Sequence, residues 1–134
     1  MKIGVHDGSI VFERGTIHRT DERESFLATE LGRTATTKLV NREWWHVDVK
    51  PESGIAVRLI FQDNRLHSVY VLHELPSDRN GEWTVERELE RRAVHDRWLR
   101  KELGEPPYEF DWGVVASEFD GKAVVSEIIV AYDR

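Results

Sequence analysis

The connectors in the middle of the chain constrain its fold more than any other feature. Three of them, Asn41-Arg42-Glu43, Pro51-Glu52-Ser53-Gly54 and Gln62-Asp63-Asn64-Arg65, are short and rich in turn-forming residues. They separate four segments with the composition of β-strands, which are Thr36 to Val40, Trp44 to Val49, Ile55 to Phe61 and Leu66 to Leu72. Strands joined by such short turns pair with their neighbours, so this region predicts an antiparallel meander.

One of these segments shows how the sheet is layered. In Ile55 to Phe61 the alternate residues Ile55, Val57, Leu59 and Phe61 share one face, and Arg58 lies on the other. Side chains alternate between the two faces of a strand. The pattern therefore predicts a sheet with one face towards the core and the other at least partly in water.

Both ends of the chain predict further hairpins. Lys2 to Val5 and Ser9 to Phe12 flank Asp7-Gly8, a residue pair that tolerates the positive φ of a tight turn. Gly113 to Phe119 and Ala123 to Tyr132 flank Asp120-Gly121. The last strand carries apolar residues on both faces, with Val124, Ser126, Ile128, Val130 and Tyr132 on one and Val125, Glu127, Ile129 and Ala131 on the other. We therefore expect it inside the sheet and not at its edge.

Two helices complete the predicted fold. Thr20 is a good N-cap and Gly32 a good stop for a first helix of about three turns. A long second helix runs from about Trp83 to Leu103 and ends at Gly104 and Pro106-Pro107. The fold class is thus α+β, with an antiparallel sheet of about six to eight strands, the long helix packed on one face and the short helix near an edge.

The long helix has two apolar stripes. The first is the expected core-facing side and contains Val85, Leu89, Ala93, Leu99 and Leu103. Trp83, Val94 and Trp98 fall on roughly the opposite side. We favour covering of this second stripe by the following segment, Pro106 to Trp112. The alternative is an exposed stripe that docks a partner or a second copy of the chain, because tryptophan is enriched at binding hot spots.

Length and charge limit the class of protein. The 134 residues fit one domain, 1–134, and there is no cysteine for a disulfide, a thiolate zinc site or a cysteine nucleophile. The formal charge of −6 argues against a general nucleic-acid binder. It suits a basic protein partner, although it is also an ordinary charge for solubility. Neither a signal peptide nor a membrane span is recognisable, so we expect a cytoplasmic protein.

The chain lacks the motifs of known catalytic sites. None of the six histidines forms an i,i+4 pair on a helix, and neither G-x-S-x-G nor a glycine-rich phosphate loop is present. His46 and Asp48 stand two apart on one strand, as two metal ligands would, but alternation produces such pairs by chance. Carboxylate pairs such as Glu118 with Asp120 are expected among 25 acidic residues. We therefore predict no catalytic residue, metal or cofactor.

Adjacent tryptophans are the remaining signal. Trp44 and Trp45 lie on one strand, so one ring faces each side of the sheet. Their charged neighbours, among them Arg42, Glu43 and Lys50, are of mixed sign, which disfavours single-stranded nucleic acid as the ligand. The candidate partner-binding residues are Trp44, Trp45, Trp83, Val94 and Trp98.

The last third of the chain carries three motifs in succession. They are Trp98-Leu99 followed by Leu103-Gly104, then W-G-x-V-x-S-x-F-D from Trp112 to Asp120, then S-x-I-x-V-x-Y from Ser126 to Tyr132. This portion resembles a group of small uncharacterised bacterial proteins, some of which are similar to immunity proteins that neutralise toxins of interbacterial competition. The resemblance implies a fold more than an activity, and it supplies no catalytic residue.

We favour a non-catalytic, acidic protein-binding module, of the immunity type implied by the resemblance, whose partner is one basic toxin domain. Two alternatives stay open. One is a small enzyme or ligand-binding domain with a pocket between the sheet and the long helix, around Trp44 or Trp45 and His46. The other is a homodimer that uses Trp83, Val94 and Trp98.

Overall fold

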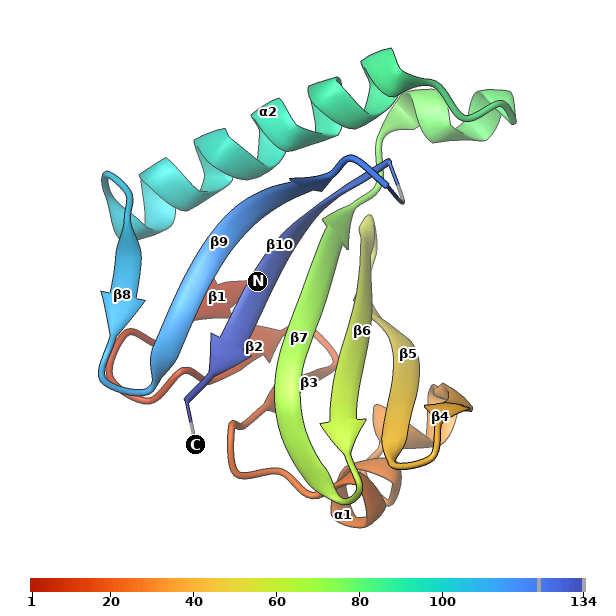
Figure 1. Cartoon of the computed structure of the whole chain (residues 1–134), viewed down its shortest axis with the longest axis vertical. Helices are drawn as coiled ribbons and strands as arrows, with labels where there is room; N and C mark the ends of the chain where they lie inside the picture. Colours follow the sequence, from red (N-terminus) through yellow and green to blue (C-terminus); the bar gives the residue numbers. More distant parts are fainter. Residues whose placement is uncertain (123, 134) are drawn as a thin grey trace.

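The short connectors fold as turns between antiparallel strands. A computed structural model describes residues 1–122 and 124–133. Its largest element is a seven-stranded sheet of order β4-β5-β6-β7-β10-β9-β8, in which every neighbouring pair is antiparallel (Figure 1). The strands are β4 (Thr36–Asn41), β5 (Trp44–Glu52), β6 (Ile55–Gln62), β7 (Arg65–His73), β8 (Tyr108–Phe110), β9 (Gly113–Asp120) and β10 (Val125–Tyr132). This architecture confirms the predicted α+β class and strand number.

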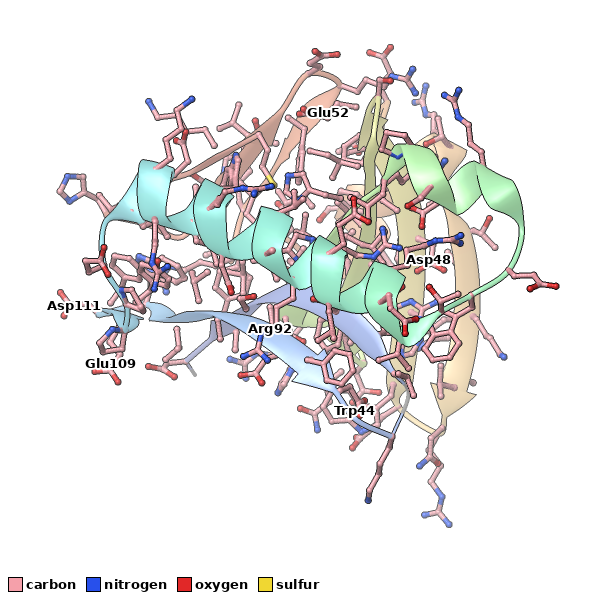
Figure 2. The ribbon with its side chains drawn as sticks, turned by 90° about the horizontal axis from the view of Figure 1, so that it is seen from above. Trp44, Asp48, Glu52, Arg92, Glu109 and Asp111 are labelled. Carbon is pink, nitrogen blue, oxygen red and sulfur yellow. The ribbon has the colours of Figure 1, made fainter. Side chains whose placement is uncertain are left out.

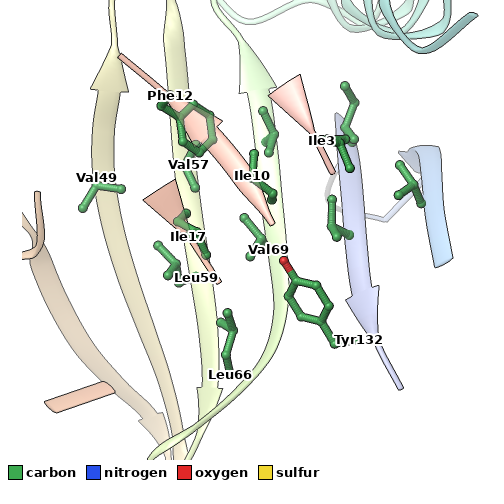
Figure 3. Packing of buried hydrophobic residues seen from close by; sticks show 14 of the residues in the cluster. Ile3, Ile10, Phe12, Ile17, Val49, Val57, Leu59, Leu66, Val69 and Tyr132 are labelled. Carbon is green, nitrogen blue, oxygen red and sulfur yellow. The ribbon is translucent and has the colours of Figure 1, made fainter. Parts of the chain in front are cut away.

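The opening hairpin forms, but in a sheet of its own. β1 (Lys2–Ile3), β2 (Ile10–Phe12) and β3 (Gly15–Ile17) make a three-stranded antiparallel sheet, of which β3 was not predicted. This small sheet lies behind the large one in the view of Figure 1. Its apolar side chains meet those of the large sheet, and Figure 3 shows Ile10, Phe12 and Ile17 beside Val57 and Leu59. Burial of such residues stabilises a fold by roughly 1.5–3 kcal/mol each.

The predicted faces of the strands are confirmed. Ile55, Val57, Leu59 and Phe61 are buried, whereas Arg58 points outward and is exposed. β10 lies between β7 and β9, as its two apolar faces predicted. The predicted first residue of that strand, Ala123, lies outside the described residues.

The first helix is shorter than predicted. α1 spans only Arg23–Leu27, and a 3-10 turn, η1 (Gly32–Thr34), follows it. The Thr29 hydroxyl donates to the carbonyl of Phe26 at 2.6 Å and accepts from the N–H of Gly32 at 3.0 Å. These local bonds satisfy the backbone groups that a continuing helix would use, so the helix ends early.

The second helix ends at the predicted residue and begins two residues after the predicted start at Trp83. α2 spans Val85–Leu103, and its N-cap Thr84 accepts a hydrogen bond from the N–H of Arg87 at 3.1 Å. Gly104 ends the helix with a φ of 86°, which favours glycine. A second 3-10 turn, η2 (Pro76–Asn80), connects β7 to this helix. Within the described residues, no helix is long and apolar enough to cross a membrane.

The predicted core-facing side of α2 is wrong. The helix buries Glu88, Arg91, His95 and Leu99, whereas Val85 is 44% and Leu89 50% exposed. Ala93 is exposed and Leu103 half-buried. Of the predicted core stripe only Leu99 is buried. The helix crosses the ends of β7 and β10, where backbone groups need polar partners, so polar side chains face inward.

The segment after α2 also differs from the prediction. Residues 108–110 form β8, which pairs with β9, so the segment does not fold over Trp83. Trp112 stacks on Phe110 with ring centroids 4.9 Å apart, and its indole N–H donates to the carbonyl of Val5 at 2.9 Å. The segment therefore covers the N-terminal loop.

The helix α2 and the three-stranded sheet lie on the same side of the seven-stranded sheet. Leu99 of α2 belongs to the same buried cluster as Ile3 and Ile10 of the small sheet. Figure 2, seen from above, shows α2 crossing over the strand ends. Arg92 lies on the side of the helix that faces β9, and Asp48 lies on a strand at the other end of the helix. Among the described residues no helix or second sheet covers the opposite face of the seven strands.

Candidate protein-interaction surface

The uncovered side of the large sheet is the candidate functional site, and we call it the open face. The strand registers define it as the side chains that alternate with the core residues. They include Thr36, Lys38, Trp44, His46, Asp48, Ala56, Arg58, Ile60, Ser68, Tyr70, Leu72, Val114, Ala116, Glu118, Asp120, Val125, Glu127, Ile129 and Ala131.

The middle of the open face is apolar. Ile60, Tyr70, Leu72, Ile129 and Ala131 are each half-buried and come from three adjacent strands, β6, β7 and β10. The solvated face of an antiparallel sheet ordinarily carries polar residues in these positions. A continuous apolar surface that the chain itself leaves uncovered indicates a place where another molecule binds.

A hollow of about 680 Å³ lies in this surface. Its lining contains Asp48, Arg58, Tyr70 and Glu127 of the open face, together with Thr36 of β4 and other residues. The hollow is open to solvent on one side. Its size and mixture of apolar and charged groups suit an inserted side chain or loop of a partner.

Three cationic side chains, Arg14, Lys50 and Arg58, line the hollow, and an acidic neighbour in the chain neutralises Arg58. Arg58 donates two hydrogen bonds to Asp48, from Nε at 2.7 Å and from a terminal nitrogen at 3.0 Å. This hydrogen bonding raises the pKa of Arg58. Both side chains are almost half exposed, so the pair contributes about 1 kcal/mol or less to stability, but its two-pronged geometry fixes the direction of the guanidinium.

The opposite side of the hollow is acidic. Burial raises the pKa of Glu127, and the nearby Asp120 raises it further, although Arg58 acts in the other direction. Burial and then the charge of Glu127 raise the pKa of Tyr70. Burial and then Arg58 lower the pKa of His46. The open face therefore presents a neutral imidazole, an apolar centre and a half-buried carboxyl group.

Only one of the predicted tryptophans of β5 lies on the open face. Trp44 lies at its margin and contacts the ring of His67, with centroids 5.1 Å apart. Trp45 pairs with Phe61 on the core side, and the guanidinium of Arg23 lies 4.0 Å from the centre of its ring. The adjacent rings thus face opposite sides of the sheet, as alternation predicted.

The structure separates the other three predicted residues. Trp83 is 51% exposed, and its indole donates to the carbonyl of Val124 at 3.1 Å, at the turn between β9 and β10. Trp98 packs partly buried against the core and the ring of His73. Val94 is half-buried. They do not form one stripe, and binding of a partner by Trp83, Val94 or Trp98 stays a prediction.

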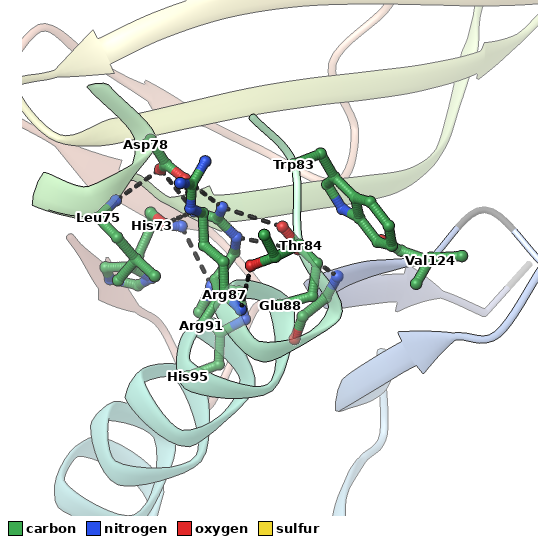
Figure 4. A network of polar contacts seen from close by, with 11 residues as sticks. His73, Leu75, Asp78, Trp83, Thr84, Arg87, Glu88, Arg91, His95 and Val124 are labelled. Atoms are coloured by element: carbon green, nitrogen blue, oxygen red, sulfur yellow. Dashed lines mark hydrogen bonds and ion pairs between the residues drawn. The ribbon is translucent and has the colours of Figure 1, made fainter. Parts of the chain in front are cut away.

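A buried polar network joins α2 to the strand ends (Figure 4). Arg91 donates to both carboxylate oxygens of Asp78, at 2.6 and 2.9 Å, and to those of Glu88, both at 3.1 Å. It also donates to the carbonyl of His73 at 2.6 Å, and Glu88 accepts from the N–H of Ser126 at 3.0 Å. Burial disfavours the cation, but these hydrogen bonds outweigh it and raise the pKa of Arg91.

The histidine in this network is not placed as a catalytic base. Nε2 of His95 accepts a hydrogen bond from the N–H of His73 at 3.1 Å, so that nitrogen is occupied. Burial, followed by the charges of His73 and Arg91, lowers the pKa of His95 to about 3. None of Arg91, Glu88 and His95 lines the hollow of the open face. The network is therefore arranged to hold the helix on the sheet.

His46 and Asp48, the pair considered as metal ligands, do not act together in the structure. Asp48 binds Arg58 through both carboxylate oxygens, which removes it as a partner for His46. Across residues 1–122 and 124–133, no group of three or more histidine or acidic side chains is arranged to hold a metal ion.

Comparison with known proteins finds the fold in a solved complex. No family model and no curated protein matches the chain. A chain of the structure described as Rhs1-CT in complex with cognate immunity protein RhsI1 is similar, with a TM-score of 0.61 and 15% sequence identity. The match covers 98% of this chain and 86% of that one. At this identity the likeness shows that the two chains share a fold.

The sequence contained a signal for the open face. Val125, Ile129 and Ala131 were recognised as a second apolar face of the last strand, and this face was interpreted as evidence for an interior position in the sheet. That position is correct, but no second layer of the described chain covers these residues. An apolar outward face on an interior strand indicates either a missing layer or a binding surface, and only the three-dimensional arrangement distinguishes the two.

Proposed function

We propose that this chain is a non-catalytic immunity-type protein that binds one toxin domain through the open face. The observation that carries the proposal is the apolar centre of that face around Tyr70 and Ile129, which no layer of the described chain covers. The shared fold with a chain from a complex of Rhs1-CT and its immunity protein supports the proposal.

The physical features of the face agree with protein binding. Its apolar centre is bordered by Asp48 and Arg58 on one side and by Glu118 and Glu127 on the other. Protein interfaces have this anatomy, with an apolar core that contributes affinity and a charged rim that selects the partner. The net charge of −6 favours encounter with a basic domain.

The test uses the toxin-like domain encoded beside the gene for this chain. Co-expression with the chain is expected to restore growth that the domain alone prevents, and the two purified proteins are expected to form a 1:1 complex. A neighbouring domain that inhibits growth whether or not this chain is present, and that does not bind it, would refute the proposal.

Ile129→Arg tests the location of the interface. It places a charge in the apolar centre, so we expect at least a tenfold loss of affinity, on the order of 1.4 kcal/mol, in calorimetric titration with the same domain. Because the residue is half-buried at a solvated face, the variant should still fold.

Val11→Arg is the matched control. Val11 is an exposed valine of β2, in the small sheet on the other side of the molecule. It is expected to leave the affinity within about twofold of the original value. Equal affinities for the two variants would place the interface elsewhere.

A further inference from the structure

Glu127 is a half-buried carboxylate of the open face whose position brings it no hydrogen bond or ion pair within the described part of the chain. It lies on β10 directly opposite Glu118 of β9. Side chains in that relation have Cβ atoms about 5 Å apart, and like charges there destabilise a sheet. Asp120 adds further negative potential at Glu127.

No cation in the described part of the chain pairs with this carboxylate. Arg58 is the positive charge that acts on Glu127, but its guanidinium is directed to Asp48 by two hydrogen bonds. No hydrogen bond or ion pair joins Glu127 to another described residue. Burial of such a group without a counter-charge lowers the stability of the free protein.

The surroundings of Glu127 suit a long side chain with a cationic end. Glu127 lines the hollow of about 680 Å³ together with Tyr70, Leu72 and Val125. The aliphatic part of a lysine or arginine gains from contact with such apolar groups while its head reaches a carboxylate. Two carboxylates without a third ligand are, in contrast, a poor site for a divalent cation.

The cations of the same lining are engaged within the chain. Arg58 binds Asp48. Lys50 pairs with Glu74 at 2.8 Å, and Arg14 donates to the carbonyl of Lys50 at 3.4 Å.

We propose that the partner inserts one lysine or arginine side chain into the hollow, where Glu127 binds its cationic head, with Glu118 directly opposite on β9. The inference rests on the proposed function and specifies the chemistry of the partner at that surface. A charge pair formed in this half-buried place loses its water on binding and acts as an anchor of the interface. The partner's cation also removes the repulsion between the two glutamates.

The experiment measures the affinity of four proteins for the same neighbouring toxin domain. They are the original chain, Glu127→Gln, Glu118→Gln and the matched control Glu90→Gln, which removes an exposed carboxylate on α2. We expect losses of about 30-fold for Glu127→Gln and about fivefold for the more exposed Glu118→Gln. The control should stay within about twofold.

Thermal melting of the free proteins separates a binding role from a structural one. Because Glu127→Gln removes an unpaired, half-buried charge, its melting temperature is expected to equal or exceed that of the original chain. A melting temperature clearly below that of Glu90→Gln would overturn the inference, because Glu127 would then stabilise the fold.

The remaining outcomes distinguish this inference from the proposed function. If the original chain and Glu127→Gln bind equally well, the inference fails and the proposed function stands. If the original chain does not bind the domain, both fail. If Glu127→Gln weakens binding, one lysine or arginine of the toxin domain must show the same loss when changed to methionine, without a further loss in the double variant. A toxin domain in which no such residue exists would overturn the inference.

Discussion

Replacement of Arg91 by methionine is expected to lower the free energy of unfolding by about 3–5 kcal/mol. The substitution leaves the buried Glu88 without its cation and the carbonyl of His73 without its donor. It leaves Asp78 with only the more distant Arg87, at 3.9 Å. A single substitution that leaves a buried charge without its partner is among the most destabilising changes. The total free energy of unfolding of a domain of this size is about 5–15 kcal/mol. Urea unfolding followed by tryptophan fluorescence measures the effect.

Arg92→Met is the matched control for this prediction. Arg92 is the next residue of α2 and is exposed, so the same substitution there is expected to change stability by about 0.5 kcal/mol or less. Adding Glu88→Gln to Arg91→Met should recover part of the loss, because the introduced glutamine carries no charge and can still accept from the N–H of Ser126. Equal stability of Arg91→Met and Arg92→Met would show that the network does not hold the helix.

The strands were predictable because each depends on neighbours in sequence. Alternation in Ile55 to Phe61 and the short connectors on either side were sufficient to predict the meander and its buried face. β3 and β8 were missed because each has only three residues, too few to show a period, and neither adjoins an Asp-Gly pair like the one that indicated β1 and β2. Their pairing partners, β2 and β9, are what make them strands.

The orientation of α2 was not predictable from its apolar periodicity. A stripe containing Val85 and Leu89 is the usual buried side of a helix. Here the helix crosses strand ends, where the carbonyl of His73 and the N–H of Ser126 need polar partners. Arg91 and Glu88 are therefore buried because they form these tertiary hydrogen bonds. No local pattern in the sequence predicts which strand ends a helix will contact.

The candidate site was predictable only in part. Trp44 and Trp45 were predicted to face opposite sides of the sheet, and Trp44 lies at the margin of the open face whereas Trp45 packs against the core. Tyr70, Glu127 and Ile129 come from strands far apart in the sequence, and only the pairing of β7 with β10 brings them together. Trp83, Val94 and Trp98 were grouped by helical periodicity, but Trp83 precedes the helix and turns towards Val124.

Acidification is expected to destabilise the chain from about pH 6.5 downwards. The pKa of His95 is about 3 in the folded protein and about 6.5 in an unfolded chain. Between these values the unfolded state binds a proton that the folded state excludes, so stability falls as the pH falls through this range. Burial also lowers the pKa of His73, which acts in the same direction. We expect a loss of about 2–3 kcal/mol between pH 7 and pH 4.5.

Asp78, a carboxylate of the buried network, adds a second stage to the loss of stability at low pH. Hydrogen bonds from Arg91 hold the pKa of Asp78 below its ordinary value, so the stability that Asp78 contributes is present above about pH 4 and is lost only at lower pH. A loss that begins near pH 6.5 therefore reports the histidines, and a steeper loss below pH 4 reports Asp78.

His95→Gln separates the two stages. Glutamine can accept a hydrogen bond from the N–H of His73 but does not titrate. The stability of the variant is therefore expected to depend little on pH between about 6.5 and 4.5 and still to fall below about pH 4. His6→Gln, at an exposed position, should retain the full profile. Urea unfolding at several pH values measures both. A His95→Gln profile identical to that of the original chain would show that His95 does not cause the loss of stability between about pH 6.5 and 4.5, and the loss would then have to come from His73.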